Sequence, residues 1–193
     1  MPTPSPIPSR IFLVGPMGAG KSSVGRCLAK RLGYRFLDND SAIAEDTGVS
    51  IPTIFDIEGE AGFRQREAHC LARLADQDQV VIATGGGAVL LAQNRRLMRR
   101  RGCVILLTAS VERQWRRTGH DPNRPLLRGP NPKAQLRALA QSRQTLYHDV
   151  ADWIIDTDRL AVTAITDDIH HRLTHPDTDS ASPHVNTPPT PEH

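Results

Sequence analysis

Short apolar runs alternate with longer amphipathic stretches between residue 10 and residue 173. Each run is almost continuously apolar, as expected of parallel strands that are covered on both faces. The predicted strands are Arg10–Val14, Tyr34–Leu37, Val80–Ala83, Val104–Thr108 and Trp153–Ile155. The predicted helices are Lys21–Leu32, Ser41–Thr47, Ile51–Ile57, Glu60–Asp76, Ala92–Arg101, Val111–Thr118, Pro132–Tyr147 and Ala161–Leu173. This alternation predicts a three-layer α/β domain with a five-stranded parallel sheet, in which ligands bind beyond the carboxyl ends of the strands.

Both ends of the chain lack this pattern. Residues 1–9 are rich in proline, and residues 174–193 in proline, threonine, serine and aspartate. We therefore expect a single domain over residues 10–173 between two disordered ends. The first residues lack the charged and apolar regions of a secretory signal, and no run of about 18 apolar residues is present to span a membrane. The three cysteines, an odd number without metal-type spacing, indicate reduced thiols and a cytoplasmic protein.

The net charge of the chain does not distinguish between small-molecule and nucleic-acid partners. The formal net charge of +3 suits anionic small molecules as well as nucleic acid. The densest basic cluster, residues 95–101, contains five arginines but no aromatic side chain that would stack on bases. We interpret it as the solvated face of a helix, and nucleic-acid binding is not expected.

The segment from Gly15 to Ser23 matches G-x-x-x-x-G-K-[ST] at every fixed position. An apolar strand precedes it and a helical pattern follows, which is the context that a phosphate-binding loop requires. Its glycines allow backbone N–H groups to surround phosphate oxygens at the start of a helix. Lys21 is placed to contact the β- and γ-phosphates, and the Ser22 hydroxyl to ligate Mg²⁺. The segment predicts binding of a nucleoside triphosphate.

Unusual residues also follow the second and third predicted strands. If the chain stays extended there, Asp38 and Asp40 point the same way and face one site; a turn or a helix cap is the alternative. Three glycines, residues 85–87, indicate either a close approach of the backbone to a ligand or close packing. Arg64 and Glu67 lie on the predicted helix between these two strands.

A polar segment after the fourth predicted strand, Arg116–Pro130, carries four arginines and is too long for a tight connection. It predicts either a lid that closes over a triphosphate or a basic linker. No aspartate ends the strand Val80–Ala83, where many phosphate-loop proteins hold Mg²⁺. This absence argues against motor, GTPase and helicase types and favours a small-molecule kinase.

These features together resemble the shikimate kinase family over about residues 9–173. The resemblance rests on the order and spacing of the phosphate-binding loop, Asp38–Asp40, Gly59–Glu67, Gly85–Ala88, Arg124–Leu127 and Arg143 with Leu146-Tyr147. It implies the sheet order 2-3-1-4-5, a lid over about residues 113–131 and a monomer. It also implies ATP-dependent phosphorylation of the 3-hydroxyl of shikimate, with Mg²⁺ as cofactor, in the biosynthesis of chorismate and aromatic amino acids.

The resemblance also implies roles on the nucleotide side. Lys21 and Arg124 would contact the transferring phosphate, and Arg117 would stack on adenine. Ser22 would hold Mg²⁺ directly, and Asp38 would hold it through water. The residues implied for ATP binding are Gly18, Ala19, Gly20, Lys21, Ser22, Ser23, Arg117 and Arg124.

On the acceptor side, the resemblance implies that Asp40 binds the reacting hydroxyl of shikimate. Arg64 and Arg143 would grip its carboxylate. Gly86 would supply a backbone contact, and Glu67 would orient the groups of the acceptor site.

Two other functions fit part of this pattern. A related kinase acting on gluconate would be expected to lack the three glycines and the Arg124–Leu127 motif. A regulatory nucleotide-binding module that has lost catalysis would be expected to have lost Asp40, Arg64, Arg124 or Arg143, and all four are present.

Overall fold

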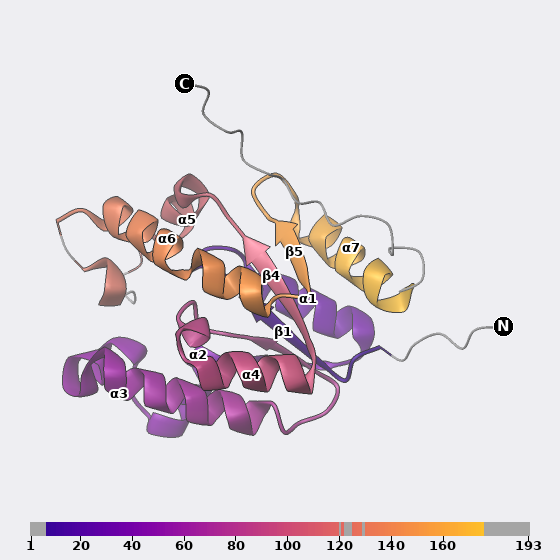
Figure 1. Ribbon diagram of the computed structural model, residues 1–193, viewed down its shortest axis with the longest axis horizontal. Coiled ribbons are helices and arrows are strands. Elements are labelled where there is room, and N and C mark those ends of the chain that lie inside the picture. Colours follow the sequence, from indigo (N-terminus) through magenta and orange to yellow (C-terminus); the bar gives the residue numbers. More distant parts are fainter. Residues whose placement is uncertain (1–6, 120, 122–124, 129, 176–193) are drawn as a thin grey trace.

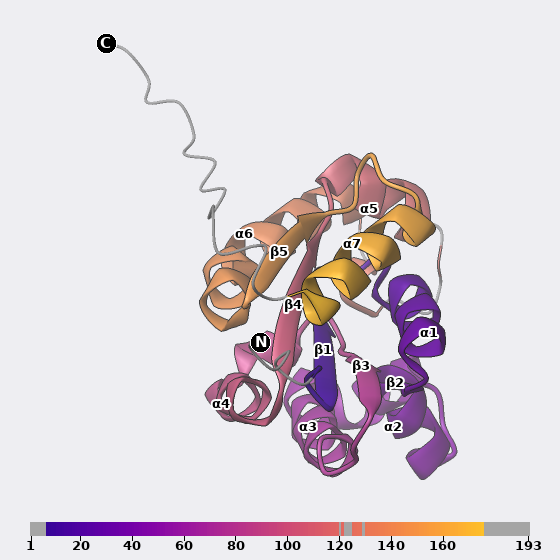
Figure 2. The same cartoon turned by 90° about the vertical axis from the view of Figure 1, so that its right-hand side faces the viewer.

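The computed structural model describes residues 7–119, 121, 125–128 and 130–175. Its centre is a five-stranded sheet, all parallel, with the order β2-β3-β1-β4-β5 (Figures 1 and 2). The predicted fold class and strand order are confirmed. The strands are β1 (Arg10–Val14), β2 (Arg35–Asp38), β3 (Val80–Ala83), β4 (Cys103–Thr108) and β5 (Trp153–Asp156).

Helices cover both faces of the sheet and give the three layers seen in Figure 2. Helices α1 and α7 pack against each other on one face, and α3, α4 and α6 lie on the other. The helices are α1 (Lys21–Leu32), α2 (Asn39–Thr47), α3 (Ile51–Leu74), α4 (Ala92–Arg101), α5 (Val111–Thr118), α6 (Pro132–Val150) and α7 (Val162–Thr174). Two short 3-10 helices, η1 (Ala88–Leu90) and η2 (Pro125–Leu127), were not predicted from the sequence.

Residues 11–14 of the central strand β1 are fully buried because they supply side chains to two cores. Ile11 and Leu13 point into the core beneath α1 and α7, and Phe12 and Val14 point into the core on the opposite face. Successive strand residues face opposite ways, so a strand covered on both sides must be apolar throughout. The position of β1 between β3 and β4 places the following loop in the middle of the carboxyl edge of the sheet.

The backbone of α3 departs from helical geometry at Gly59, where φ is 70° and ψ is −178°. The sequence predicts two helices there, 51–57 and 60–76, and the structure has one element with a kink between those parts. Residues other than glycine rarely adopt this conformation. The kink brings Phe55 from the first part of α3 against Phe63 from the second part. The centroids of their rings lie 4.7 Å apart.

Residues 7–9 belong to the stretch that the sequence analysis expects to be disordered, but they contact the domain. Ile7 packs against the core beneath α1 and α7, and the Ser9 carbonyl accepts a hydrogen bond from the Val80 amide. At the other end, Thr174 was also predicted to be disordered but is the last residue of α7, and His175 caps that helix. The remaining residues of both predicted disordered ends, 1–6 and 176–193, lie outside the described residues. None of the helices in the described part of the chain has both the length and the apolar character that a bilayer-spanning segment needs.

Candidate active site

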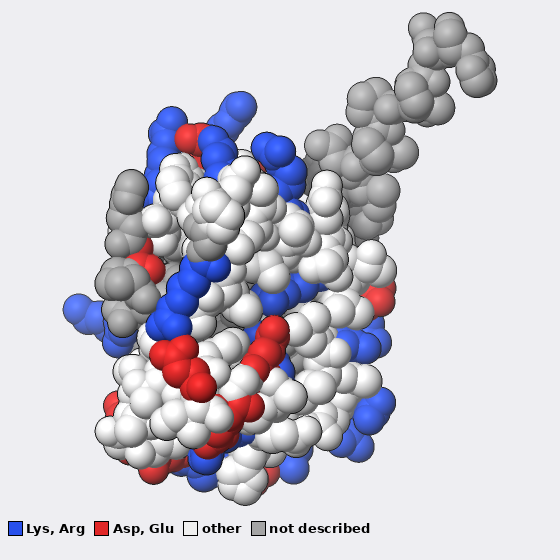
Figure 3. All heavy atoms as spheres, turned by 90° about the vertical axis from the view of Figure 1, so that its left-hand side faces the viewer, with Lys and Arg blue, Asp and Glu red and all other residues white. Residues whose placement is uncertain are grey.

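A cleft of about 700 Å³ lies along the carboxyl edge of the sheet. Basic side chains reach into the hollow on this face of the molecule, and acidic side chains gather along its lower rim (Figure 3). Ala19 is buried within the phosphate-binding loop, and Arg124 lies outside the described residues. The predicted site residues that line the cleft are Gly18, Gly20, Lys21, Ser22, Ser23, Asp38, Asp40, Arg64, Glu67, Gly86, Arg117 and Arg143.

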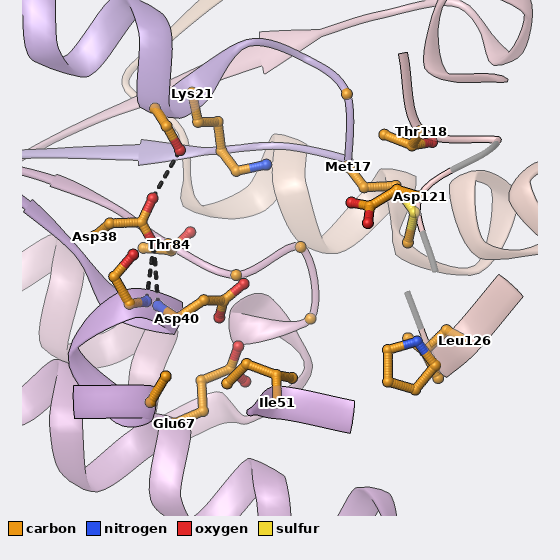
Figure 4. A pocket seen from close by; sticks show the side chains of 18 of the residues that line it. Met17, Lys21, Asp38, Asp40, Ile51, Glu67, Thr84, Thr118, Asp121 and Leu126 are labelled. Carbon is orange, nitrogen blue, oxygen red and sulfur yellow. Dashed lines mark hydrogen bonds between the residues drawn. The ribbon is translucent and has the colours of Figure 1, made fainter. Parts of the chain in front are cut away.

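The phosphate-binding loop connects β1 to α1, and its first residues contact the side chain of Lys21. Lys21 is the first residue of α1, and its amine donates hydrogen bonds of 2.8 Å to the carbonyls of Gly15 and Pro16. Gly20 caps the helix with a left-handed backbone at φ 92°. The lysine amine and the amino end of α1 therefore face the same part of the cleft (Figure 4), where they favour bound anions.

Asp38, the last residue of β2, joins the phosphate-binding loop to the start of α2. Its Oδ2 accepts a 2.7 Å hydrogen bond from the Ser22 hydroxyl, and its Oδ1 accepts from the amides of Asp40 and Ser41 (Figure 4). Asp38 is thus the N-cap of α2, and Asp40 lies in the first turn of that helix. The prediction of an extended Asp38–Asp40 segment is wrong, because capping draws the chain into a helix immediately after β2.

Asp40 and Glu67 approach each other at Gly85. A methyl group built on Gly85 would lie 2.8 Å from Asp40 Oδ1 and would overlap Glu67 Oε1. Any residue larger than glycine at position 85 would therefore displace one of the two carboxylates. This packing explains the first of the three glycines.

Glu67 is fully buried and forms an ion pair with Arg64, whose Nη1 lies 2.7 Å from Glu67 Oε2. Glu67 Oε1 has no hydrogen-bond partner among the described residues. Burial raises the pKa of Glu67 to about 7, although the positive charge of Arg64 opposes the rise. Arg64 also donates to Glu60, and its guanidinium fills the space that a methyl group on Gly87 would need.

Helix α6 brings a second buried arginine to the cleft. Arg143 is 5% exposed, and Tyr147, one turn later, is 4% exposed. The Tyr147 hydroxyl donates a hydrogen bond to the Gly86 carbonyl at 2.5 Å. Arg64 from α3 and Arg143 from α6 therefore line the cleft together with the glycine loop between β3 and η1.

Helix α5 supplies the opposite end of the cleft. The Arg117 guanidinium donates a 2.7 Å hydrogen bond to the Gly18 carbonyl, so this arginine lies beside the phosphate-binding loop. Burial and the nearby charge of Arg113 lower the pKa of Arg117. Val162, at the start of α7, lines the same cleft.

The chain that follows α5 returns to the first part of α3. Arg128 Nη1 lies 2.6 Å from Asp56 Oδ1, and both side chains are at least half exposed. Leu126 lies across the cleft from Ile51 (Figure 4).

The apolar wall of the cleft was not predicted from the sequence. Ile51, Pro52 and Phe55 from the first part of α3 line it together with Phe63. The spacing of Ile51 and Phe55 by one helical turn was available as a signal. Their meeting with Phe63 depends on the kink at Gly59, which the helical pattern does not specify.

Comparisons with known proteins agree with this geometry. A family model described as shikimate kinase matches residues 17–174. The shikimate kinase of Halorhodospira halophila is 58% identical over 150 residues, which cover 78% of this chain and 85% of that protein. The shikimate kinase of Nitrosococcus oceani is 52% identical over 163 residues, which cover 84% of this chain and 86% of that protein.

Solved structures show the same similarity. The structure of shikimate kinase from Acinetobacter baumannii in complex with shikimate has a TM-score of 0.85 and 46% sequence identity to this chain. The match covers 88% of this chain and 94% of that one. The chain therefore belongs to the shikimate kinase family.

Proposed function

We propose that this protein transfers the γ-phosphoryl group of ATP to the 3-hydroxyl of shikimate and releases ADP and shikimate 3-phosphate. The observation that carries the proposal is the meeting of two buried arginines, Arg64 and Arg143, with Asp40 and the phosphate-binding loop in one cleft. We further propose that the enzyme acts as a monomer in the cytoplasm, as a step in the biosynthesis of chorismate and aromatic amino acids.

The acceptor pocket suits a small carboxylate that also carries hydroxyl groups. Two guanidinium groups are well matched to a planar carboxylate, because each can donate two parallel hydrogen bonds. In our proposal Arg64 and Arg143 hold the carboxylate, Gly86 adds a backbone contact and Glu67 keeps Arg64 in place. Asp40 then receives the hydroxyl that reacts.

The nucleotide occupies the other end of the cleft. We propose that the backbone of Gly18, Ala19 and Gly20 surrounds the phosphates, with the hydroxyls of Ser22 and Ser23 nearby. Lys21 neutralises charge on the transferring phosphate, and Arg117 stacks on adenine. Arg124 is proposed to reach the transferring phosphate from the segment after α5.

A magnesium ion fits beside this loop. The Ser22 hydroxyl and the Asp38 carboxylate lie 2.7 Å apart and supply the hard oxygen ligands that Mg²⁺ prefers. Within the described residues, no cluster of three or more His, Cys, Asp or Glu side chains is arranged to hold a metal ion. This agrees with Mg²⁺ sites in kinases, where one or two protein groups act together with phosphates and water. The bound ion would neutralise phosphate charge.

Phosphoryl transfer depends more on the positioning of the two substrates than on a strong base. The acceptor oxygen forms a bond to the γ-phosphorus while the bond from that phosphorus to the bridging oxygen of ADP breaks. Because the transition state is loose, the acceptor hydroxyl loses its proton late, and in our proposal Asp40 accepts it. Lys21 and Arg124 stabilise the charge on the transferring oxygens.

Measurement of ADP release with ATP, Mg²⁺ and one acceptor at a time tests the proposal. Shikimate should support turnover, while gluconate and nucleoside monophosphates should not exceed the background without acceptor. Turnover with gluconate and none with shikimate would identify a different kinase. Absence of turnover with every acceptor, in a protein that still binds ATP, would favour a regulatory module.

A further inference from the structure

We propose that Tyr147 is a positioning residue of the acceptor pocket, whose hydroxyl fixes the Gly86 carbonyl beside Arg143. The sequence places Tyr147 in a motif with Arg143 and Leu146 but predicts no role for it. The inference rests on the proposed function, because Arg143 and Gly86 are placed there in contact with the acceptor.

The hydroxyl connects two elements that are far apart in the sequence. Tyr147 lies near the end of α6 and donates its proton to the Gly86 carbonyl at 2.5 Å. Arg143 lies one helical turn earlier on α6. Burial raises the pKa of Tyr147, and the positive charge of Arg143, which acts on the hydroxyl, lowers it. The hydroxyl therefore lies between the guanidinium of Arg143 and the Gly86 carbonyl, to which it donates.

The environment of the hydroxyl keeps it a donor. Burial raises the pKa of Tyr147 to about 12, and Glu67 adds to the rise, whereas Arg143 and Arg64 oppose it. The group therefore remains protonated across the range in which the carboxylate of an acceptor is ionised.

The ring of Tyr147 is buried in the core and also lines a second cavity. A cavity of about 280 Å³ lies behind Tyr147, between α5, α6 and the end of β4. Its walls include Leu106, Val111 and Ala140. The hydrogen bond to Gly86 fixes the hydroxyl end of a ring that is otherwise held by the core on this face of the sheet.

The Gly86 carbonyl is a sensitive point in the site. Gly85, before it, packs against Asp40 and Glu67, and Gly87, after it, packs against Arg64. A shift of the Gly86 peptide would disturb these neighbours as well as the orientation of Arg143. The loss should fall on the binding of the acceptor carboxylate, which does not change charge during the reaction, and so on affinity more than on the chemical step.

The test is Tyr147→Phe, with Tyr34→Phe as the matched control. The chain has two tyrosines, and Tyr34 immediately precedes β2 at the opposite end of the sheet. Tyr147→Phe removes one oxygen and keeps the ring. We expect the KM and the dissociation constant for shikimate to rise roughly tenfold, as for the loss of one buried hydrogen bond that leaves its carbonyl unpaired. The KM for ATP and kcat should stay within about twofold, and Tyr34→Phe should match the unmodified enzyme.

Some outcomes would overturn the proposal. One is an unchanged shikimate KM in Tyr147→Phe. Another is an equal loss of shikimate and ATP affinity together with a lower Tm, which would indicate a general structural role. Absence of shikimate-dependent ADP release in the unmodified enzyme would instead refute the proposed function and is seen before any variant is made.

A spectroscopic titration gives a readout that does not depend on activity. In Tyr34→Phe, Tyr147 is the remaining tyrosine, and its ionisation is followed by absorbance near 295 nm. A pKa near 12 supports the buried hydrogen-bonded hydroxyl. A pKa near 10, the ordinary value for tyrosine, would contradict it.

Discussion

Replacement of Gly87 by alanine should weaken shikimate binding and leave ATP binding nearly unchanged. The backbone at Gly87 has φ −99° and ψ 0°, which alanine adopts without strain. The added methyl group would nevertheless overlap the guanidinium of Arg64, well inside the 3.0 Å below which such contacts essentially do not occur. The variant is therefore expected to displace the side chain of Arg64 while the backbone at residue 87 keeps its conformation.

The size of the effect follows from the contacts of Arg64. To make room, the guanidinium must move, which disturbs its 2.7 Å ion pair with Glu67 and its hydrogen bonds to Glu60. A displaced Arg64 no longer pairs with the substrate carboxylate, and losing one partner of a buried charge pair costs about 2 kcal/mol or more. That corresponds to a rise of roughly thirtyfold or more in the shikimate KM.

The loss of stability should be smaller than the loss of binding. Because burial already raises the pKa of Glu67 to about 7, this carboxyl takes up a proton when Arg64 leaves and does not remain as a buried charge. We expect Tm to fall by only a few degrees, at about 2–4 °C per kcal/mol for a domain of this size.

The assay is steady-state kinetics with shikimate and ATP varied separately, supported by calorimetric titration with shikimate. Gly86→Ala is the comparison, since a methyl group there would lie 3.5 Å from the Met17 amide nitrogen and 3.7 Å from the Tyr147 hydroxyl, both ordinary contacts. It reports the cost of a methyl group in the same loop when Arg64 stays in place. A shikimate KM within twofold of the unmodified enzyme in Gly87→Ala would refute the steric reasoning.

Three further variants test other parts of the cleft. Lys21→Ala should lower ADP formation at least about a hundredfold with little change in Tm, because the amine serves phosphate and not the core; an active variant with normal ATP affinity would contradict this. Arg143→Ala should raise the shikimate KM roughly thirtyfold and leave the ATP KM nearly unchanged. A raised ATP KM with an unchanged shikimate KM would show that Arg143 does not bind the acceptor. Glu67 has a pKa raised from 4.5 to about 7 by burial, so its contribution to stability is complete below pH 4.5 and is lost as the pH rises through 7. Glu67→Gln should therefore flatten the pH dependence of the free energy of unfolding between these values by roughly 3 kcal/mol, measured by urea unfolding without ligands; an unchanged slope would contradict the raised pKa.

The fold could be predicted from the sequence because its signals are local. The continuous apolar runs of β1, β3 and β4 have no alternative to burial on both faces. The phosphate-binding motif likewise specifies a strand, a loop and a helix in one stretch of residues. The strands and α1 accordingly lie within a residue or so of their predicted bounds.

The contacts of the acceptor site could not be predicted in the same way, because they join distant residues. That Gly87 leaves space for Arg64, or that Tyr147 meets Gly86, depends on how α3 and α6 pack against the sheet. For Asp38 and Asp40 the prediction failed for a different reason. Their pattern is local, but it is compatible with both an extended segment and a helix cap, and the hydrogen bonds from Asp40 and Ser41 to Asp38 decide between them.

If the segment after α5 acts as the predicted lid, the ion pair between Arg128 and Asp56 affects how quickly products are released. Both side chains are at least half exposed, and such pairs contribute about 0.2–1 kcal/mol. If this pair forms each time the segment after α5 closes over the cleft, it favours the closed arrangement by fivefold at most. A stronger contact would hold ADP and the phosphorylated product in place and slow each cycle. Added salt screens such a pair, so the time spent closed should shorten as ionic strength rises.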